Sequence, residues 1–344
     1  MIRRLSVLLV AASLAATSAG AQGVDTGRCP AGTTSGPFNT PDQTRAAQDA
    51  CQKAIDLFNY MAPQLGISIT GGNATLGRGG TLGGLGHFSV GVRVNAVQGS
   101  IPQIQNVTPS VQGAQSSRYD TKSQIIGLPT ADLAIGLFKG LPLAITNVGG
   151  VDLLVSASYL PEFNTSGIDV KVPNGSLKLG YGARLGILQE SLLVPGVSVT
   201  YLKRDLPTVN VTANSGNDSL YVNNLSVKTD AWRVVASKNL LFLGLAVGAG
   251  QDKYKSTTDV RAHVAARTVP FATPAANAAP ASPLLQDLTR TNVFADLTMN
   301  LLLFKLNGEI GQVSGGTIPT YNTFSGKQAA DSRIYGSVGV RFGF

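Results

Sequence analysis

Hydrophobic and polar residues alternate along most of the chain after residue 87, and the alternation continues to the end of the sequence. In the segment 331–344, one parity is apolar apart from Gly336, and the other is polar or small. The apolar parity comprises Ile334, Val338, Val340, Phe342 and Phe344, and the other comprises Arg333, Tyr335, Ser337, Gly339 and Arg341. A period of two residues predicts a strand with one apolar face and one polar face.

The same alternation predicts strands elsewhere in the chain. Clear patterns cover 88–96, 177–187, 241–250, 292–301 and 304–310. Weaker patterns cover 118–127, 129–139, 150–160, 196–204, 207–213, 219–228, 229–238 and 257–267. With the final segment they predict an all-β protein of about 12–14 antiparallel strands, because strand boundaries are the least certain part of such patterns.

The composition favours strands that face lipid on one side. The chain is 43% hydrophobic and only 13% charged, and it contains 40 glycines. A membrane helix needs about 18 consecutive apolar residues, whereas the best apolar run, Leu240 to Gly250, is interrupted by glycine. Strands in a membrane barrel expose only alternate residues to lipid. We therefore expect residues 87–344 to form a transmembrane antiparallel β-barrel, with a soluble exported β-protein as the alternative.

The ending also resembles the C-terminal signature of bacterial outer-membrane β-barrels. In these proteins a terminal aromatic residue is recognised by the barrel-insertion machinery, and here Val340, Phe342 and Phe344 match that signature. The resemblance implies location in the bacterial outer membrane. It also implies that outer-membrane lipid and the insertion machinery are partners of the chain.

The first 21 residues predict a secretory signal peptide. Arg3 and Arg4 precede the apolar segment 5–16, and Ala19-Gly20-Ala21 provides an A-x-A cleavage site. Its removal takes away two positive charges and lowers the net charge from +8 to +6. No cluster of Lys and Arg with interleaved aromatic residues is present, so nucleic acid is not an expected partner.

Residues 22–86 predict a helical segment before the barrel. Cys29 and Cys51 are the two cysteines, and in an exported chain they predict one disulfide. Thr40 can cap a helix, and Pro63 with Gly66 is expected to end it. This short helix could form a periplasmic cap or a plug in the barrel lumen. The glycine-rich segment 71–86 lacks a complete nucleotide-binding motif and predicts a flexible or tightly turned linker.

Loop lengths predict an orientation, because barrels of this class have short periplasmic turns and long outer loops. With the C-terminus placed in the periplasm, the loops 315–330, 268–287, 140–149 and 100–117 are expected outside. The connections at 301–304, at Ser256 and at 173–175 are expected inside, together with the N-terminal helix. Outward Tyr159, Tyr201 and Phe342 are expected at the membrane interface, although cross-strand packing in a soluble sheet would also explain them.

Charged residues of the polar parity are candidates for lining the lumen. The basic candidates are Arg93, Lys178, Arg184, Arg233, Lys305, Arg333 and Arg341, and the acidic ones are Asp132, Asp152, Asp296 and Glu309. Their sum is positive and predicts a preference for anions, unless opposite charges pair across neighbouring strands. Phe242, Phe294 and Gly248 could line an apolar route or fill the lumen.

The sequence does not predict an enzyme. The only histidines are His87 and His263, and no spacing brings either together with a nucleophile and an acid. No metal ligand set is recognisable, because no histidine lies near the two cysteines. We therefore expect no catalytic residues, metal or cofactor, with a barrel hydrolase as the least favoured reading.

The predicted function is passive uptake of small solutes or hydrophobic molecules through the barrel. The architecture is similar to that of the long-chain fatty acid outer-membrane transporter family, which has fourteen strands and an N-terminal plug. The Asn-Pro-Ala stretch of that family is absent from this sequence, so none of its ligand residues can be assigned here. The alternative is a barrel that transports nothing and serves the envelope or binds a partner through its outer loops.

Overall fold

The computed structural model describes most of the chain. The described residues are 28–30, 33–34, 41–73, 75, 77–104, 107–165, 168–267, 274–301 and 303–343. The predicted signal peptide and Phe344 therefore lie outside the described residues. No helix in these ranges is both long and apolar enough to cross a membrane.

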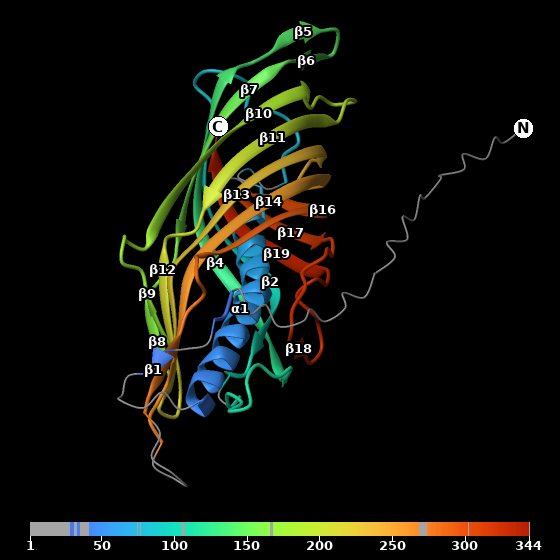
Figure 1. Ribbon diagram of the computed structural model, residues 1–344. Coiled ribbons are helices and arrows are strands. Elements are labelled where there is room, and N and C mark those ends of the chain that lie inside the picture. Colours follow the sequence, from blue (N-terminus) through green and yellow to red (C-terminus); the bar gives the residue numbers. More distant parts are fainter. Residues whose placement is uncertain are drawn as a thin grey trace, which may run out of the picture.

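Ten antiparallel strands pair side by side and close into a ring (Figure 1). They are β2 (Phe88–Pro102), β4 (Thr121–Phe138), β7 (Gly150–Tyr159), β10 (Leu177–Leu188), β11 (Gly196–Asp205), β13 (Asp218–Leu240), β14 (Leu243–Val264), β16 (Leu284–Asn300), β17 (Lys305–Val313) and β19 (Arg333–Gly343). Each strand pairs with the next in the chain, and β19 pairs with β2 to close the ring. Closure leaves no open sheet edge along the paired region, as a sheet in lipid requires.

Further short strands extend this sheet beyond the ring. β12 (Val209–Ser215), β9 (Ile168–Lys171) and β8 (Phe163–Thr165) continue from β13, and β15 (Ala276–Ala278) and β1 (Thr33–Thr34) continue from β14. Two small pairs lie apart, β3 (Arg118–Tyr119) with β18 (Thr323–Phe324) and β5 (Leu141–Leu143) with β6 (Thr146–Val148). Without the two-residue β1, the main sheet has fourteen strands, which confirms the predicted fold class and count.

Ten of the fourteen strands form the ring, because some predicted neighbours merge into single long strands and the other strands are short extensions of the sheet. The segments 219–228 and 229–238 are both parts of β13, and 257–267 overlaps the end of β14. β13 has 23 residues and β14 has 22. At about 3.3 Å per residue each is roughly 70 Å long, more than twice the thickness of the hydrocarbon core. One half of each strand must therefore lie outside the membrane.

The apolar face of the wall changes side within these long strands. In β14, Leu245 and Val247 face outward and are exposed, whereas farther along the strand the outward residues are Lys253 and Lys255. The inward positions change in the opposite sense, since Val260 in the second half is buried. Outward apolar residues indicate contact with lipid, and outward charges indicate contact with water. The change near Gln251 therefore marks one membrane boundary.

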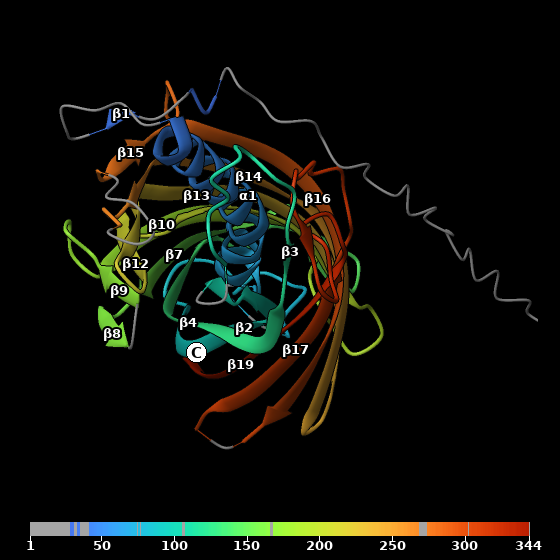
Figure 2. The same ribbon diagram turned by 60° about the horizontal axis from the view of Figure 1, so that its bottom comes forward.

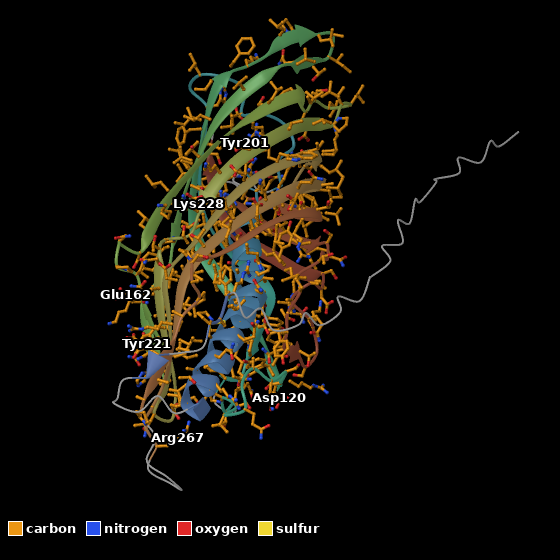
Figure 3. All side chains as sticks on the ribbon, viewed as in Figure 1. Asp120, Glu162, Tyr201, Tyr221, Lys228 and Arg267 are labelled. Atoms are coloured by element: carbon orange, nitrogen blue, oxygen red, sulfur yellow. A yellow bond between two sulfur atoms is a disulfide. The ribbon has the colours of Figure 1, made fainter. Side chains whose placement is uncertain are left out.

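Exposed aromatic residues flank the outward apolar band. Phe88, Phe138, Phe242, Phe304 and Phe342 lie near one margin, and Tyr159, Tyr181, Tyr201 and Trp232 lie toward the other. Phe242 and Trp232 are separated by about ten residues, which span about 33 Å along a strand and roughly 25 Å across the membrane when the strand is tilted. This height matches the apolar band of outer-membrane barrels. Figure 3 shows Lys228 beyond Tyr201 along the barrel wall.

The two ends of the ring differ in their connections. At the end that holds Phe342, which we call the short-turn end, Leu241–Phe242 and residues 301–304 join strands tightly. At the opposite, long-loop end, the connections 103–120, 160–176, 206–217, 265–283 and 314–332 are long. The sequence grouped 100–117, 268–287, 315–330 and 140–149 at one end, and the described parts of the first three lie together at the long-loop end. The grouping was wrong for 140–149, which lies at the short-turn end, and for 173–175, which lies at the long-loop end.

Ser256 is not a turn, contrary to the expectation, but an inward, fully buried position inside β14. The alternation of the strand continues through it, and only the chemistry of the two faces changes there. When the apolar residues of a strand move from one face to the other, the alternation in the sequence is interrupted. The interruption then resembles the end of a strand.

One long helix, α1 (Pro41–Thr70), lies against the inner wall, and Figure 2 shows it surrounded by the strands. Its first turn is at the long-loop end, where Gln43 Nε2 donates to Ala265 O at 2.9 Å. Its last residue reaches the middle of the ring, where Thr70 Oγ1 lies 3.1 Å from Asp252 Oδ2. Of the two positions that the sequence left open, a periplasmic cap and a plug in the lumen, the helix therefore has the one inside the ring.

The helix is also longer than expected, because neither predicted stop ends it. Pro63 has no N–H for the carbonyl of Asn59, and Gln286 Nε2 of β16 donates to that carbonyl at 3.2 Å instead. Gly66 is packed so closely against Tyr254 that a Cβ would lie 2.7 Å from the ring. The glycine thus provides close packing against the wall and does not end the helix.

We expect a charge on the apolar band to destabilise the barrel. Val247→Arg places a guanidinium on the lipid side of β14, which should cost about 2–4 kcal/mol because no partner in the hydrocarbon replaces water. Gln251→Arg, on the same face four residues farther along, should cost much less. Urea unfolding in lipid vesicles measures both variants. Equal losses in the two variants would contradict the position of the membrane boundary.

Candidate functional site

The glycine-rich residues that follow α1 lie inside the ring, and the backbone N–H groups of these residues bind wall carboxylates. Gly72 N donates to Glu309 Oε1 at 3.0 Å, and Gly77 N donates to Asp296 Oδ2 at 3.3 Å. Leu82 N donates to both Asp152 oxygens at 3.1 Å. A buried backbone donor without a partner costs free energy, so these carboxylates stabilise a segment that has no regular secondary structure.

Wall arginines bind the carbonyl groups at the end of the helix. Arg204 Nη1 donates to Ile69 O at 3.2 Å and to Gly72 O at 3.1 Å, and Arg93 Nη1 donates to Gly71 O at 2.8 Å. Arg233 donates to Thr70 O. The last carbonyls of a helix lack intrahelical partners and carry partial negative charge. Guanidinium groups from three strands provide these partners.

Two glycines let this backbone approach the wall. A Cβ on Gly77 would lie 1.8 Å from Thr298 Oγ1, and one on Gly72 would lie 2.5 Å from Arg93 Nη1. Both residues also have positive φ, at 71° and 72° respectively, a conformation that other residues rarely adopt. Of the segment expected as a flexible or tightly turned linker, these described residues pack closely against the inner wall. We call α1 and residues 71–86 together the inserted segment.

Arg184 and Asp152 form the most buried ion pair of the wall. They are direct cross-strand partners on β10 and β7, and Arg184 Nη2 lies 2.6 Å from Asp152 Oδ2. Both side chains are completely buried. Arg184 also donates to the hydroxyl of Thr75, so the pair contacts the inserted segment through both partners.

Three further ion pairs lie along the same wall. Arg93 pairs with Asp132 on the neighbouring strand. Arg233 lies 3.7 Å from Asp252 Oδ1 and 3.8 Å from Glu309 Oε1. The ion pairs that join neighbouring strands also place groups that bind the inserted segment.

Ten of the eleven residues predicted to line the lumen point inward in the structure. Arg93, Asp132, Asp152, Arg184, Arg233, Asp296, Glu309, Arg333 and Arg341 are buried, and Lys305 is half-buried. Lys178 is exposed near the start of β10 and does not join the buried network. Phe294 is inward, with Arg233 over its ring, whereas Phe242 is exposed in a tight turn.

Three members of the network were missed from the sequence: Arg204, Asp252 and Arg290. All three are buried on the inward parity of their strands. Extending the alternation of β11, β14 and β16 would have found them. With them, the described strands carry seven buried arginines and five buried carboxylates, so the wall is positive overall.

Loops cover α1 at the long-loop end. Asp49 accepts from Ser110 N at 2.7 Å and from Gln115 N at 2.9 Å. Asp56 Oδ2 accepts from the backbone and side chain of Asn322 at 2.7 and 2.6 Å. The Tyr60 ring stacks on Phe324 with centroids 4.0 Å apart. The loops 103–120 and 314–332 are thus joined to the helix by polar and aromatic contacts.

The disulfide predicted between Cys29 and Cys51 is present, and both residues are fully buried. It joins the residues before the helix to its third turn, within an apolar cluster that includes Ala47, Ala54 and Val264. The bridge therefore fixes the start of the inserted segment against the long-loop half of the wall.

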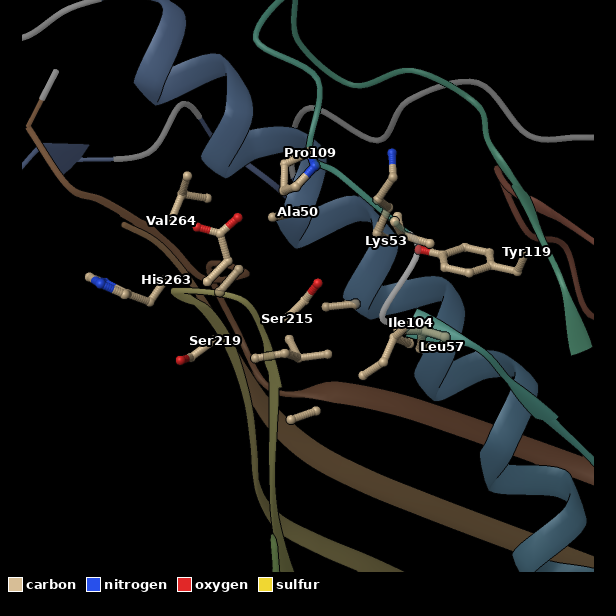
Figure 4. Close-up of a pocket in the computed structure, with 16 residues that line it drawn as sticks. Ala50, Lys53, Leu57, Ile104, Pro109, Tyr119, Ser215, Ser219, His263 and Val264 are labelled. Atoms are coloured by element: carbon tan, nitrogen blue, oxygen red, sulfur yellow. The ribbon is translucent and has the colours of Figure 1, made fainter. Parts of the chain in front are cut away.

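A small apolar cavity of about 80 Å³ lies beside the helix at this end (Figure 4). Ala54, Leu57, Ile104 and Leu220 contribute to its lining. Its volume is close to that of a small hydrocarbon group, and Lys53, Ser215 and Asp218 also contribute to its lining.

The two histidines lie at opposite ends of the barrel and cannot form one site. His87 is exposed at the short-turn end. His263 Nδ1 lies 2.9 Å from Asn277 Oδ1 at the long-loop end, and its ring points away from the apolar cavity (Figure 4). Within the described ranges, no three His, Cys, Asp or Glu side chains are grouped as metal ligands.

The closed antiparallel ring, its outward apolar band and its polar interior define an outer-membrane β-barrel. No family model matches the sequence, and no curated protein matches it. One similar solved structure is the toluene transporter TodX of Pseudomonas putida, with a TM-score of 0.29 and 10% sequence identity over 75% of this chain and 88% of that chain. Another is the toluene transporter TbuX of Ralstonia pickettii, with a TM-score of 0.28 and 12% identity over 79% of this chain and 92% of that chain. The attachment invasion locus protein Ail of Yersinia pestis is also similar (0.28, 9%, 76% and 99%).

Removing one partner of the buried pair should be costly. Arg184→Ala leaves Asp152 buried without its cation, which should lower the free energy of unfolding by about 3–5 kcal/mol. Lys253→Gln breaks an exposed pair with Asp287 and should cost less than about 1 kcal/mol. Urea unfolding in detergent micelles measures both. If Arg184→Ala lowers the free energy of unfolding as little as Lys253→Gln does, the buried pair does not stabilise the folded barrel.

Asp56 should make stability depend on pH. Burial raises the pKa of its carboxyl above the ordinary 3.8, and the Asn322 hydrogen bonds lower it only in part. The folded state then binds the proton more tightly than the unfolded state, so this contribution to stability decreases as pH rises from 3.8 through the raised pKa.

The isosteric change Asp56→Asn removes that dependence. The difference in Tm between Asp56→Asn and the unchanged protein should therefore become more positive as pH rises from 4 to 8, measured by thermal scans in detergent. Asp120→Asn removes an exposed carboxylate of the neighbouring loop and serves as the control. A constant difference for Asp56→Asn across this range would refute the assignment.

Proposed function

We propose that this protein is a gated outer-membrane channel for small solutes, in which movement of the inserted segment opens the passage. The observation that carries the proposal is how the lumen is filled. Charged side chains of the wall bind a separate backbone segment through hydrogen bonds. In small barrels, by contrast, the side chains of the wall themselves fill the interior. Each of these hydrogen bonds can be exchanged for one with water.

The contacts of the segment differ along its length, and this difference supports a local movement. Residues 71–86 contact the wall mainly through polar groups. The helix instead packs through apolar residues such as Ala54, Ile55 and Phe58 and is fixed by the disulfide. Displacing the glycine-rich part would expose a small cluster around Leu82, whereas displacing the helix would expose a much larger hydrophobic cluster. We infer that residues 71–86 are the moving part and that the helix is its anchor.

By the rule that short turns face the periplasm, the long-loop end faces the outside. A solute would then pass the loops 103–120 and 314–332 before reaching the charged region. The non-transporting barrel remains the competing function, and the same occupied lumen would serve it if the segment never moved.

Loosening the glycine-rich part should increase conduction. Gly77→Ala adds a methyl group that overlaps Thr298 Oγ1, and the positive φ adds strain of about 1 kcal/mol. In planar bilayers we expect brief openings of the unchanged protein and several-fold more frequent openings of Gly77→Ala. Gly308→Ala, which meets no atom within 4 Å, should behave like the unchanged protein.

A result of no conductance for all three proteins, together with no solute release from loaded liposomes, would establish the non-transporting barrel instead. Conductance that is equal in Gly77→Ala and Gly308→Ala would show that the passage does not involve residues 71–86.

The open passage should prefer anions. Seven buried arginines outnumber five buried carboxylates on the wall, and lumen charge sets selectivity. Reversal potentials of Gly77→Ala under a potassium chloride gradient should therefore have the sign of chloride permeation. Replacing Arg93 or Arg204 by Gln should reduce that preference. A cation preference would contradict the charge assignment of the wall.

A further inference from the structure

Three cationic side chains meet at the short-turn end of the lumen. Lys305 and Arg341 are direct cross-strand partners on the inner face of β17 and β19. Arg78 of the inserted segment faces them across a cavity of about 370 Å³, which all three residues line. Like charges directly opposite each other on a sheet destabilise it, so this arrangement is unfavourable when no anion is present.

The surrounding groups do not neutralise the three charges. Glu190 is the one carboxylate that lines the cavity. Its oxygens accept hydrogen bonds from the backbone and side chain of Asn239 and from Ser237 Oγ. Two positive charges therefore remain in excess around the cavity.

Arg341 provides the second observation. Only 8% of this residue is exposed, and its Nη1 has no hydrogen-bond partner among the described residues. The buried guanidinium of Arg184, in contrast, is bound by Asp152, Thr75 and Arg78 O. A buried guanidinium donor without an acceptor costs more than an ordinary unpaired donor because it is charged. The position beside the cavity makes a bound oxyanion the natural acceptor.

We propose that this cavity is a binding site for a small polyvalent oxyanion, such as phosphate or a short dicarboxylate. Its volume corresponds to about twelve water molecules at about 30 Å³ each, which is enough for such an ion with some of its hydration. Guanidinium groups bind oxyanions through paired, charge-assisted hydrogen bonds. If the protein conducts, small oxyanions are the solutes that this site would select. This physiological role rests on the proposed channel function.

The test uses the full chain, purified in non-ionic detergent without phospholipid and titrated with inorganic phosphate in a calorimeter. We expect one phosphate per chain. Lys305→Gln and Arg341→Gln should each weaken binding at least about tenfold, since each removes a charge-assisted hydrogen bond. Lys253→Gln removes an exposed charge of the outer face and should leave the affinity unchanged.

Thermal scans give a second readout, and the scans recorded without phosphate do not depend on binding. Without phosphate, Lys305→Gln should raise Tm because it removes the repulsion from Arg341, whereas a lysine with only a structural role would lower Tm when replaced. Phosphate should raise the Tm of the unchanged protein and have a much smaller effect on Lys305→Gln.

The absence of phosphate binding at millimolar concentration, or equal affinity of all variants, would overturn the site. Displacement of phosphate by added phosphatidylglycerol would show that the cations bind a lipid headgroup, which also contradicts the proposal. Bilayer conductance is measured separately. Conduction without phosphate binding would support the channel function and exclude this site. Phosphate binding without conduction would support the site and exclude the channel function.

Discussion

The structure depends on satisfying the backbone of a segment that is enclosed by a β-barrel. The described residues of the segment 71–86 form neither helix nor strand, so their N–H and C=O groups have no regular partners. In the lumen, the wall supplies those partners from side chains, with carboxylates for Gly72, Gly77 and Leu82 and arginines for the carbonyls at the end of α1. Charged groups are suited to this because each hydrogen bond they make is stronger than a neutral one.

This requirement also explains why charges are buried at such density. A buried ion pair is weak evidence for stability, because desolvation offsets most of the attraction between the charges. The pair of Arg184 and Asp152 instead fixes both side chains in place, so that each can bind the inserted segment as well. The network therefore specifies the position of that segment more than it contributes to the total stability. Such a network also leaves the segment able to exchange its partners for water.

The wall meets two environments along its length, and its two faces change accordingly. In the half near the short turns, lipid covers the outside and polar groups face the lumen, as Val247 and Arg233 illustrate. In the half near the long loops, water covers the outside, and the inner face packs against α1 through residues such as Val260 and Leu225. The second half therefore folds like an ordinary soluble protein around a hydrophobic core, and it anchors the helix whose continuation occupies the membrane half.

The sequence alone determined the strand class, the outward apolar face, the disulfide and the parity of the charged residues. These depend on local alternation and on two cysteines, which need no knowledge of distant contacts. Ring size, the merging of 219–228 with 229–238, the continuation of the helix through Pro63 and the entry of the helix from the long-loop end were decided only by the tertiary structure. The physical reason is that each depends on a partner far away in the chain. Gln286 binds the carbonyl that Pro63 leaves free. The change from lipid to water outside the wall moves the apolar residues of the long strands to the inner face. Arg78 lies near Lys305 and Arg341 only once the ring has closed around the inserted segment.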